Sequence, residues 1–313
     1  MQTVVECVPN FSEGRNPHTV EEIAAAIEKV ADAYVLDLHM DPDHNRSVIT
    51  FVGSKEGVGE AAARAVGRAA ELIDLNRHQG VHPRIGAADV VPFTPVQGAT
   101  IADCVEIAHR TGQEIYTRYR VPVYFYGAAA LRPERVLLER VRGAGYEQLR
   151  SLGLDDPSRR PDVGEFQLHP TAGATIVGAR PFLIAFNVNL DSSDRQVAQE
   201  IARKIRSSAG GLQGVKAMGV LLESRRAGGR TGQAQVSMNL TDFERTSVAA
   251  AFRAVEQEAR RLGVEIESSE IVGLIPQKAW AGTHPAELKL TGFHSEKILE
   301  NRLAAVLARR SGR

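Results

Sequence analysis

The sequence VVECV at residues 4–8, followed by PHTVEEIAAAIEKV at residues 17–30, sets a pattern that the rest of the chain follows. The first run is short, apolar and rich in valine, which predicts a β-strand. In the second run apolar residues recur at helical spacing, and Pro17 suits the first turn of a helix. We therefore expect a strand followed by an amphipathic helix.

The same alternation continues beyond this opening. Further elements of the first half are strands expected at residues 34–38, 47–52 and 89–93 and a helix of small residues expected at 56–73. The resulting order is β-α-β-β-α-β. This order returns in the second half, in elements expected at residues 182–188, 193–206, 215–222, 235–240, 245–262 and 264–271. The chain is therefore predicted to be a structural duplication.

Two such units in tandem predict an α+β protein made of two ferredoxin-like subdomains. We place an N-terminal subdomain at residues 1–178 and a C-terminal subdomain at residues 179–313. A segment rich in Gly, Arg, Asp and Pro, at residues 142–164, is expected near the seam between them. Additional helices are expected at residues 101–118, 133–141 and 295–309. Duplicated α/β proteins commonly bind a ligand between their halves, so a groove or tunnel is expected there.

The composition excludes several classes of protein. The 313 residues, 43% of them hydrophobic, are enough for two cores. Lys and Arg total 38, as do Asp and Glu, so no net charge attracts nucleic acid or an acidic membrane. Two cysteines, Cys7 and Cys104, are too few for a disulfide framework. No signal segment or membrane-spanning stretch is recognised, and we expect a cytoplasmic protein.

Residues 77–86, RHQGVHPRIG, combine two histidines and two arginines with glycine and proline residues that oppose a continuous helix. On a helix, the spacing of His78 and His82 would suit zinc, but no glutamate lies between them and no metal site is expected. Histidine beside arginine instead suggests proton transfer next to an anionic ligand. The alternative for His82 is a structural residue in a turn before proline.

Carboxylates lie near these histidines in the sequence. Asp89 could orient an imidazole, or it could simply begin a strand. A second polar cluster, DLHMDPDHNR at residues 37–46, falls at a connection between two expected strands. Asp37 is expected to point opposite to Leu36 and Leu38. The cluster is either part of a site or an ordinary acidic turn.

A third polar cluster, GEFQLHPTAGAT, occupies residues 164–175 and is followed by Gly178 and Arg180. Its glycines permit close backbone approach to a flat or anionic ligand, although the motif of a phosphate-binding loop is absent. The sequence GGRTG at residues 228–232 is interpreted as a hairpin turn.

These clusters and further motifs resemble those of the formiminotransferase family, and the resemblance covers about residues 1–275. The matching stretches are ECVPNFSEG at residues 6–14, Asn45-Arg46, HQGVHPRIG at 78–86, PVY at 122–124, Tyr126-Gly127, GAT at 173–175 and the run from there to FNVN at 186–189. The resemblance implies two ferredoxin-like subdomains with a folate-binding tunnel between them, and association as a homodimer. It also implies transfer of a formimino group from N-formimino-L-glutamate to N5 of tetrahydrofolate.

The resemblance assigns roles to particular residues. The family's catalytic histidine falls on His82, which would act as general acid and base. Candidate supporting residues are His78, Asp37, Asp89 and Tyr126. Candidates for binding the substrate carboxylates are Asn45, Arg46, Arg77, Arg84 and Arg180. The family's folate-contacting segment falls on Val163, Gly164, Glu165, Phe166, Gln167, Leu168, His169, Pro170, Thr171 and Ala172.

The implied co-substrate is tetrahydrofolate with a polyglutamate tail, and the implied reaction requires no metal. The product would leave the protein or pass to a separate cyclodeaminase, since no such domain is recognised in the sequence. Two alternatives stay open. The chain could bind or sense folate without catalysis, or it could salvage another N5-substituted folate. An RNA-binding role is not expected, because the sequence lacks the charge and the aromatic strand motif for it.

Overall fold

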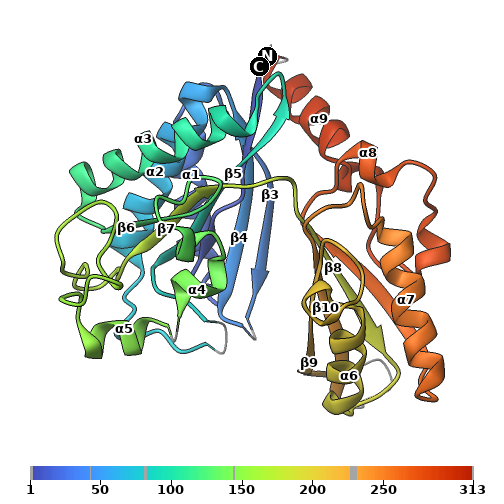
Figure 1. The fold of residues 1–313 in the computed structure, drawn as a ribbon. Coiled ribbons are helices and arrows are strands. Elements are labelled where there is room, and N and C mark those ends of the chain that lie inside the picture. Colours follow the sequence, from blue (N-terminus) through green and yellow to red (C-terminus); the bar gives the residue numbers. More distant parts are fainter. Residues whose placement is uncertain (1–2, 43, 81–82, 144, 226–230, 312–313) are drawn as a thin grey trace. The chain divides into compact units, whose positions relative to one another are not determined.

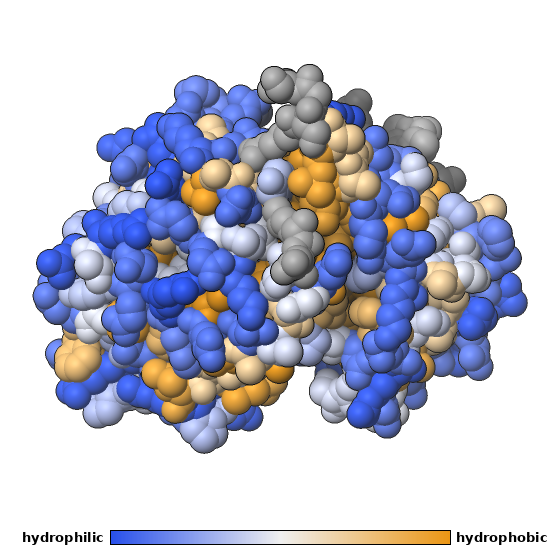
Figure 2. Space-filling model, turned by 90° about the horizontal axis from the view of Figure 1, so that it is seen from above, coloured by the Kyte–Doolittle hydropathy of each residue, from blue (hydrophilic) through white to orange (hydrophobic). Residues whose placement is uncertain are grey.

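The computed structural model describes residues 3–42, 44–80, 83–143, 145–225 and 231–311. The chain forms two compact units, Met1–Pro181 and Phe182–Arg313, each with its own sheet and helices (Figure 1). The α+β class predicted from the sequence is confirmed. Among the described residues, no helix is long and apolar enough to cross a membrane. Hydrophilic side chains predominate on the face seen in Figure 2, and hydrophobic ones form smaller patches.

The first unit begins with the predicted order of elements, with one short strand, β2, that was not predicted. These are β1 (Val4–Cys7), β2 (Asn10–Phe11), α1 (Pro17–Glu28), β3 (Ala33–Asp41), β4 (Arg46–Gly53), α2 (Lys55–Leu72) and β5 (Ala88–Gln97). Local sequence explains the starts of the helices: the side chain of Asn16 accepts a hydrogen bond from the amide of His18, and Ser54 accepts one from Gly57. Both helices therefore begin within one residue of the expected position.

The sheet of this unit has β1 and β2 at its centre, each antiparallel to β4 on one side and β5 on the other, with β3 outside β4. Beyond β5 lie two parallel strands that the sequence analysis did not predict. They are β7 (Thr175–Ala179), next to β5, and β6 (Val123–Gly127), at the edge. Helix α3 (Ile101–Tyr119), which was expected, precedes β6 and begins with a capping box of Thr100 and Asp103.

Short helical segments follow β6: η1 (Pro133–Arg135), α4 (Leu138–Arg142) and α5 (Tyr146–Leu152). The segment at residues 142–164 was expected near the seam between the two halves, and its described part belongs to the first unit. The amides of Asp162 and Val163 both donate to the carbonyl of Val123 at the start of β6. A buried ion pair at 2.7 Å between Arg135 and Asp162 holds it further.

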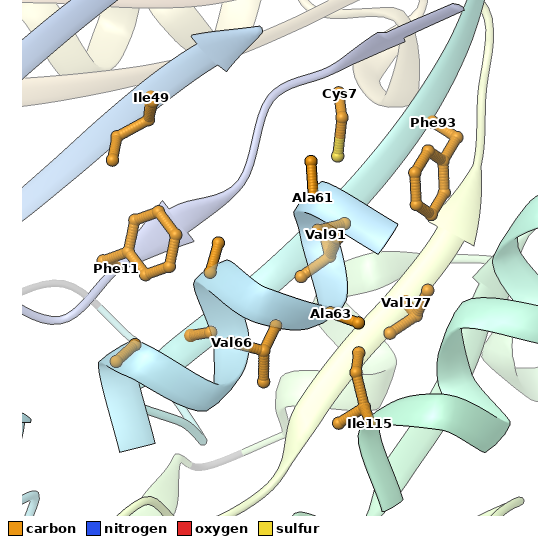
Figure 3. Close-up of a cluster of buried hydrophobic side chains, with 14 of the residues drawn as sticks. Cys7, Phe11, Ile49, Ala61, Ala63, Val66, Val91, Phe93, Ile115 and Val177 are labelled. Carbon is orange, nitrogen blue, oxygen red and sulfur yellow. The ribbon is translucent and has the colours of Figure 1, made fainter. Parts of the chain in front are cut away.

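Helices α1, α2 and α3 cover one face of this sheet. Figure 3 shows strand side chains facing α2 and α3, among them Cys7, Phe11, Ile49, Val91, Phe93 and Val177. The alternate residues of β5, β6 and β7 point to the other face, as the two-residue period of a strand requires. There they form a second apolar cluster, against which Leu138 and Val141 of α4 and Leu149 of α5 pack. The segment after β6 therefore covers a face that α1 to α3 leave open.

The second unit also follows the predicted order. Its core elements are β8 (Ile184–Leu190), α6 (Arg195–Ile205), β9 (Val215–Arg225), β10 (Thr231–Leu240), α7 (Val248–Arg261) and β11 (Ile266–Val272). The strands form an antiparallel sheet in the order β11-β8-β10-β9, and an apolar core lies between the sheet and α6 and α7. After β11 come α8 (Gln277–Trp280), η3 (Pro285–Leu288), η4 (Ser295–Lys297) and α9 (Leu299–Ser311).

Candidate functional site

The three polar clusters of the sequence meet in the first unit. The turn between β3 and β4 carries the second cluster, the chain between α2 and β5 carries the first, and the chain before β7 carries the third. A small cavity of about 10 Å³, which opens to solvent, lies between the first and second clusters. Its lining residues are Phe11, Ser12, His44, Asn45, Arg46, His78, Arg84 and Asp89.

Asn45 joins the loops around this cavity. Its side-chain oxygen accepts from the amide of Gly14 at 2.9 Å, and its side-chain nitrogen donates to the carbonyl of Gln79 at 2.9 Å. The residue has φ of 49°, in the left-handed region that asparagine tolerates better than most residues. A Cβ at Gly14 would overlap the backbone of Asp41 and Arg46, so this approach requires glycine. Asn45 is therefore a structural hub for the site.

The turn that presents Asn45 is held by its own side chains. Asp41 accepts hydrogen bonds from the ring nitrogen Nδ1 of His44 at 2.6 Å and from the His44 amide at 2.9 Å. Burial alone would raise the pKa of Asp41, but these bonds lower it to about 2. Burial also lowers the pKa of Arg46, to about 10, and the nearby Arg142 lowers it in the same direction. Arg46 still carries its charge at neutral pH.

His78 lies where the first and second clusters touch. Its Nε2 donates to the carbonyl of Asn45 at 3.0 Å. Its Nδ1 is buried and has no hydrogen-bond partner among the described residues. Burial lowers the pKa of His78, the hydrogen bond to Asn45 raises it and Arg84 lowers it, with a net decrease from the ordinary value. The imidazole is therefore neutral at pH 7.

Arg84 is a buried arginine at the same site. Its Nη2 donates to the carbonyl of His78 at 3.1 Å and pairs with Oε1 of Glu147 at 2.8 Å. The Nε of Arg84 is buried with no hydrogen-bond partner in the part of the chain that the structure describes. The amide of Tyr146 donates to the carbonyl of Arg84 at 2.7 Å. Helix α5, which carries Tyr146 and Glu147, thus fixes the end of the loop between α2 and β5.

Asp89, which was considered as a partner for an imidazole or as the start of a strand, contacts a backbone amide and an arginine. Its Oδ1 accepts from the amide of Ile85 at 2.9 Å, and its Oδ2 accepts from Nε and Nη2 of Arg142 at 2.9 and 2.6 Å. Among the described residues this carboxylate contacts no histidine. It holds the loop against α4 instead.

The second half of the candidate folate segment borders the same loop. His169 and Gly173 exchange backbone hydrogen bonds, and Nδ1 of His169 accepts from the amide of Ala172 at 3.0 Å. The carbonyl of Thr171 accepts from the amide of Leu75, and that of Ala172 accepts from Ala87. Two chains far apart in sequence are therefore joined by their backbones.

The first half of that segment lies against α3. Val163 pairs with Val123, and the amide of Glu165 donates to the hydroxyl of Tyr116 at 3.2 Å. Gly164 packs against the Tyr116 ring with φ of 110°. Phe166 is 51% exposed, under the guanidinium of Arg160. The remaining residues of the segment are Gln167, which is exposed, Leu168, which packs on the core, and Pro170, whose carbonyl accepts from Asn76.

Four other candidates lie outside the cavity lining. Arg77 is 89% exposed and lies 3.6 Å from Asp74. It lines an open groove of about 780 Å³, together with Leu75, Asn76, His78, Gln79, Tyr146, Glu147 and Arg150. Tyr126 and Arg180 contact each other through a side-chain hydrogen bond, and burial raises the pKa of the tyrosine.

Asp37 is half-buried on β3, opposite Thr50 of β4. The expectation that Leu36 and Leu38 share one orientation is wrong, since Leu36 is buried whereas Leu38 is 38% exposed. An irregularity between Val35 and Asp37 interrupts the alternation.

Two expectations fall outside the described residues: the role of His82 and the hairpin turn at residues 228–230. Among the described residues, no group of three or more His, Cys, Asp or Glu side chains could hold a metal ion. Sequence reasoning missed Arg142, Tyr146 and Glu147, because a presumed linker carries no local signal of contacts with residues more than 50 positions away.

Comparisons with known proteins identify the family of this chain. Residues 4–180 match the N-terminal subdomain of the formiminotransferase domain, and residues 185–287 match the formiminotransferase domain itself. The chain belongs to the formiminotransferase family. It is 42% identical over 304 residues to a glutamate formimidoyltransferase of Streptococcus pyogenes serotype M1, covering 97% of this chain and 99% of that protein.

Two other relatives show how far the similarity reaches. A glutamate formimidoyltransferase of Thermoplasma acidophilum is 42% identical over 96% of this chain and 97% of its own length. A formimidoyltransferase-cyclodeaminase of Mus musculus is 42% identical over 89% of this chain but only 51% of its own length. The formiminotransferase similarity therefore extends to part of a longer relative.

Proposed function

We propose that this protein is a glutamate formimidoyltransferase, which transfers the formimino group of N-formimino-L-glutamate to N5 of tetrahydrofolate and releases L-glutamate. The observation that carries the proposal is the 42% identity to a protein of that name, over 97% of this chain and 99% of the relative. The meeting of the first and second polar clusters at one cavity supports it from the structure.

The chemistry requires proton transfer and a grip on carboxylates. The N5 amine attacks the formimino carbon and forms a tetrahedral centre that bears three nitrogens. A proton leaves N5, a proton reaches the glutamate nitrogen, and the bond between that nitrogen and the carbon breaks. His82 takes and returns these protons in the proposed mechanism.

The described residues around the cavity fit this task. Arg46 and Arg84 keep cationic groups at the cavity, where substrate carboxylates need them. The buried Nε of Arg84 and Nδ1 of His78 offer a donor and an acceptor that the described residues do not use. Arg77 and Arg180 lie outside this lining, and we assign them to the tails of the acidic substrates, including the polyglutamate chain of the folate.

An activity assay with matched histidine variants tests the proposal. The protein is mixed with tetrahydrofolate and formiminoglutamate, and release of glutamate is measured. We expect His82→Ala to lower kcat/KM about a hundredfold to ten-thousandfold, as for loss of a general acid and base. His18→Ala, at an exposed histidine at the start of α1, is the control and keeps full activity. If the native protein released glutamate no faster than buffer does, the proposal would be wrong.

Binding measurements separate catalysis from folate sensing. A ligand that binds the native state raises its melting temperature, so folinate stabilises both the native protein and His82→Ala. A protein that is stabilised by folinate but inactive with every N5-substituted folate and donor would be a sensor. One that reacts only with another N5-substituted folate would be a salvage enzyme.

Arg84 has a separate test. Arg84→Ala is expected to raise the KM for formiminoglutamate, because a charge-assisted contact with a substrate carboxylate is lost. Arg84→Lys retains the charge but not the planar fork of donors. Its KM for formiminoglutamate is expected to lie between those of the native protein and Arg84→Ala. An unchanged KM in Arg84→Ala would exclude this role.

The assembly of the protein is also proposed. The strand order β11-β8-β10-β9, with two helices on one face, supports a ferredoxin-like second subdomain. A ferredoxin-like first subdomain, a folate tunnel, a homodimer and a separate cyclodeaminase partner follow from the family resemblance. Light scattering of the purified protein at several concentrations tests the dimer, and a monomeric mass throughout would exclude it.

A further inference from the structure

His78 is shared by two hollows of the first unit. It lines the cavity beside Asn45 and Arg84, and it also lines the open groove beside Gln79 and Glu147. No other described residue appears in both linings. A side chain in this position can contact a ligand that enters from the groove and reaches the cavity.

The surroundings fix which ring nitrogen of His78 carries the proton. The carbonyl of Asn45 can only accept, so Nε2 at 3.0 Å from it must be the donor. A neutral imidazole protonated on Nε2 has a lone pair on Nδ1. That Nδ1 is buried and has no hydrogen-bond partner within the described part of the chain. A buried acceptor without a partner is costly unless a ligand supplies a donor.

Nδ1 of His78 is the only buried acceptor without a hydrogen-bond partner among the described side chains of the cavity lining. The two oxygens of Asp89 are engaged with Ile85 and Arg142. The side-chain oxygen of Asn45 accepts from Gly14. Arg46 and Arg84 present donors only. A ligand group with N–H donors, placed in this cavity, therefore meets Nδ1 of His78 as its acceptor.

The formimino group is such a ligand group. It is an amidine, and in its protonated form each of its nitrogens carries hydrogen and neither offers a lone pair in the plane. We infer that Nδ1 of His78 accepts a hydrogen bond from a formimino N–H of the donor substrate and so orients the carbon that N5 attacks. The inference rests on the proposed function and deepens it, because it names a substrate-contacting residue in addition to His82.

The role is one of binding and orientation, and His78 neither gains nor loses a proton in it. The Nε2 proton stays on the ring and is donated to the carbonyl of Asn45. Orientation of the attacked carbon affects the rate as well as the affinity, because N5 must approach the planar amidine carbon from above its plane.

Two substitutions separate the two ring nitrogens. The amide nitrogen of Gln in His78→Gln can reach the position of Nε2 and donate to Asn45, but nothing replaces Nδ1. The amide oxygen of Asn in His78→Asn can reach the position of Nδ1, but the bond to Asn45 is lost. We expect His78→Gln to keep its melting temperature and to lose roughly tenfold to a hundredfold in kcat/KM, the range for a lost bond to a charged group.

The reciprocal result is expected for His78→Asn, which should melt at a lower temperature yet exceed His78→Gln in kcat/KM. The matched control is His109→Gln. His109 makes the same type of bond, from Nε2 to the carbonyl of Ala129 at 2.8 Å, but it does not line the cavity. Its activity should be unchanged.

A spectroscopic measurement tests the contact directly. In protein labelled with ¹⁵N-histidine, the Nδ1 resonance of His78 should move on addition of formiminoglutamate and should not move on addition of glutamate, which lacks the amidine. Full activity of His78→Gln, or an unmoved Nδ1 resonance in an active native protein, would overturn the inference and leave the proposed function intact. An inactive native protein would instead overturn the proposed function.

Discussion

The two units share one order of elements but place their polar side chains differently. In the second unit, polar residues lie on regular strands and bind one another: Asn187 donates to Glu270 at 2.9 Å, and Gln235 donates to Asn189 at 2.8 Å. In the first unit, the polar residues of the cavity lie mostly on loops, which side chains from distant segments hold in place. The same order of elements therefore supports a polar sheet surface in the second unit and a cavity lined by loops in the first.

The difference comes from the chain between β5 and β7. The second unit has no counterpart of this segment between its core strands in the described residues, whereas in the first unit it supplies α3, β6, α4 and α5. Arg142 and Glu147 from this segment bind Asp89 and Arg84 of the loop between α2 and β5. This added segment thus provides the side chains that hold the loops of the site in place.

The largest expected effect concerns the buried pair that holds this insertion. The side chains of Arg135 and Asp162 are 4% and 3% exposed. Arg135→Ala would remove the nearer of two cations from a buried carboxylate, which would keep Arg132 at 3.7 Å and the amide of Phe125 at 2.8 Å. It should lower the free energy of unfolding by about 3 kcal/mol, measured by urea denaturation. The control is Lys278→Ala in the second unit, whose pair with Glu244 is exposed and is worth less than about 1 kcal/mol. If the two variants lowered the free energy of unfolding equally, the buried pair of the first unit would not be the stronger anchor that we infer.

A smaller effect is expected at Asn45, the hub of the cavity. Asn45→Ala loses two hydrogen bonds and places at φ of 49° a residue that tolerates the left-handed region less well than asparagine, so stability should fall by about 2 kcal/mol and activity with it. Asn45→Gly loses the same bonds without the steric cost of the left-handed conformation. It should therefore be the more stable of the two. The reverse order would show that conformation is not what selects asparagine here.

A still smaller loss of stability is expected for a substitution among the polar strand residues of the second unit. Gln235→Leu removes the bond to Asn189 and fills the same volume, which should cost about 1–2 kcal/mol on denaturation. Because the strands of this sheet are held by backbone pairing, the loss should stay local to that bond. A loss larger than that of Asn45→Ala would mean that the sheet surface, and not the loop site, is the more tightly coupled region.

The smallest effect is a pH dependence at the turn between β3 and β4. The pKa of Asp41 is lowered to about 2 in the fold from 3.8, so its contribution is present above pH 3.8 and is lost as pH falls toward 2. Its side chain is 36% exposed, so solvent screening reduces the contribution to about 1 kcal/mol. Asp41→Asn should flatten the acid limb of the stability curve by that amount. An unchanged limb would exclude a role for the pair with His44.

Local patterns of residues predict most of the elements. Helix starts at Asn16 and Ser54 depend on neighbours within one turn, and the apolar period depends on the element itself, so both can be recognised without the fold. Strands β6 and β7 were missed for the converse reason. A strand buried on both faces has no alternation, and in β7 a glycine at position 178 further weakens the strand pattern.

The sequence by itself determined the duplicated order of elements, the polar clusters and the family to which the chain belongs. Only the tertiary structure decided that Asp89 binds Arg142, 53 residues away, and that Arg84 binds Glu147, 63 residues away. It also decided that one nitrogen of His78 is engaged while the other is not. Helical and strand periods arise from contacts between near neighbours, whereas these pairings exist only when packing of the sheet brings distant loops together.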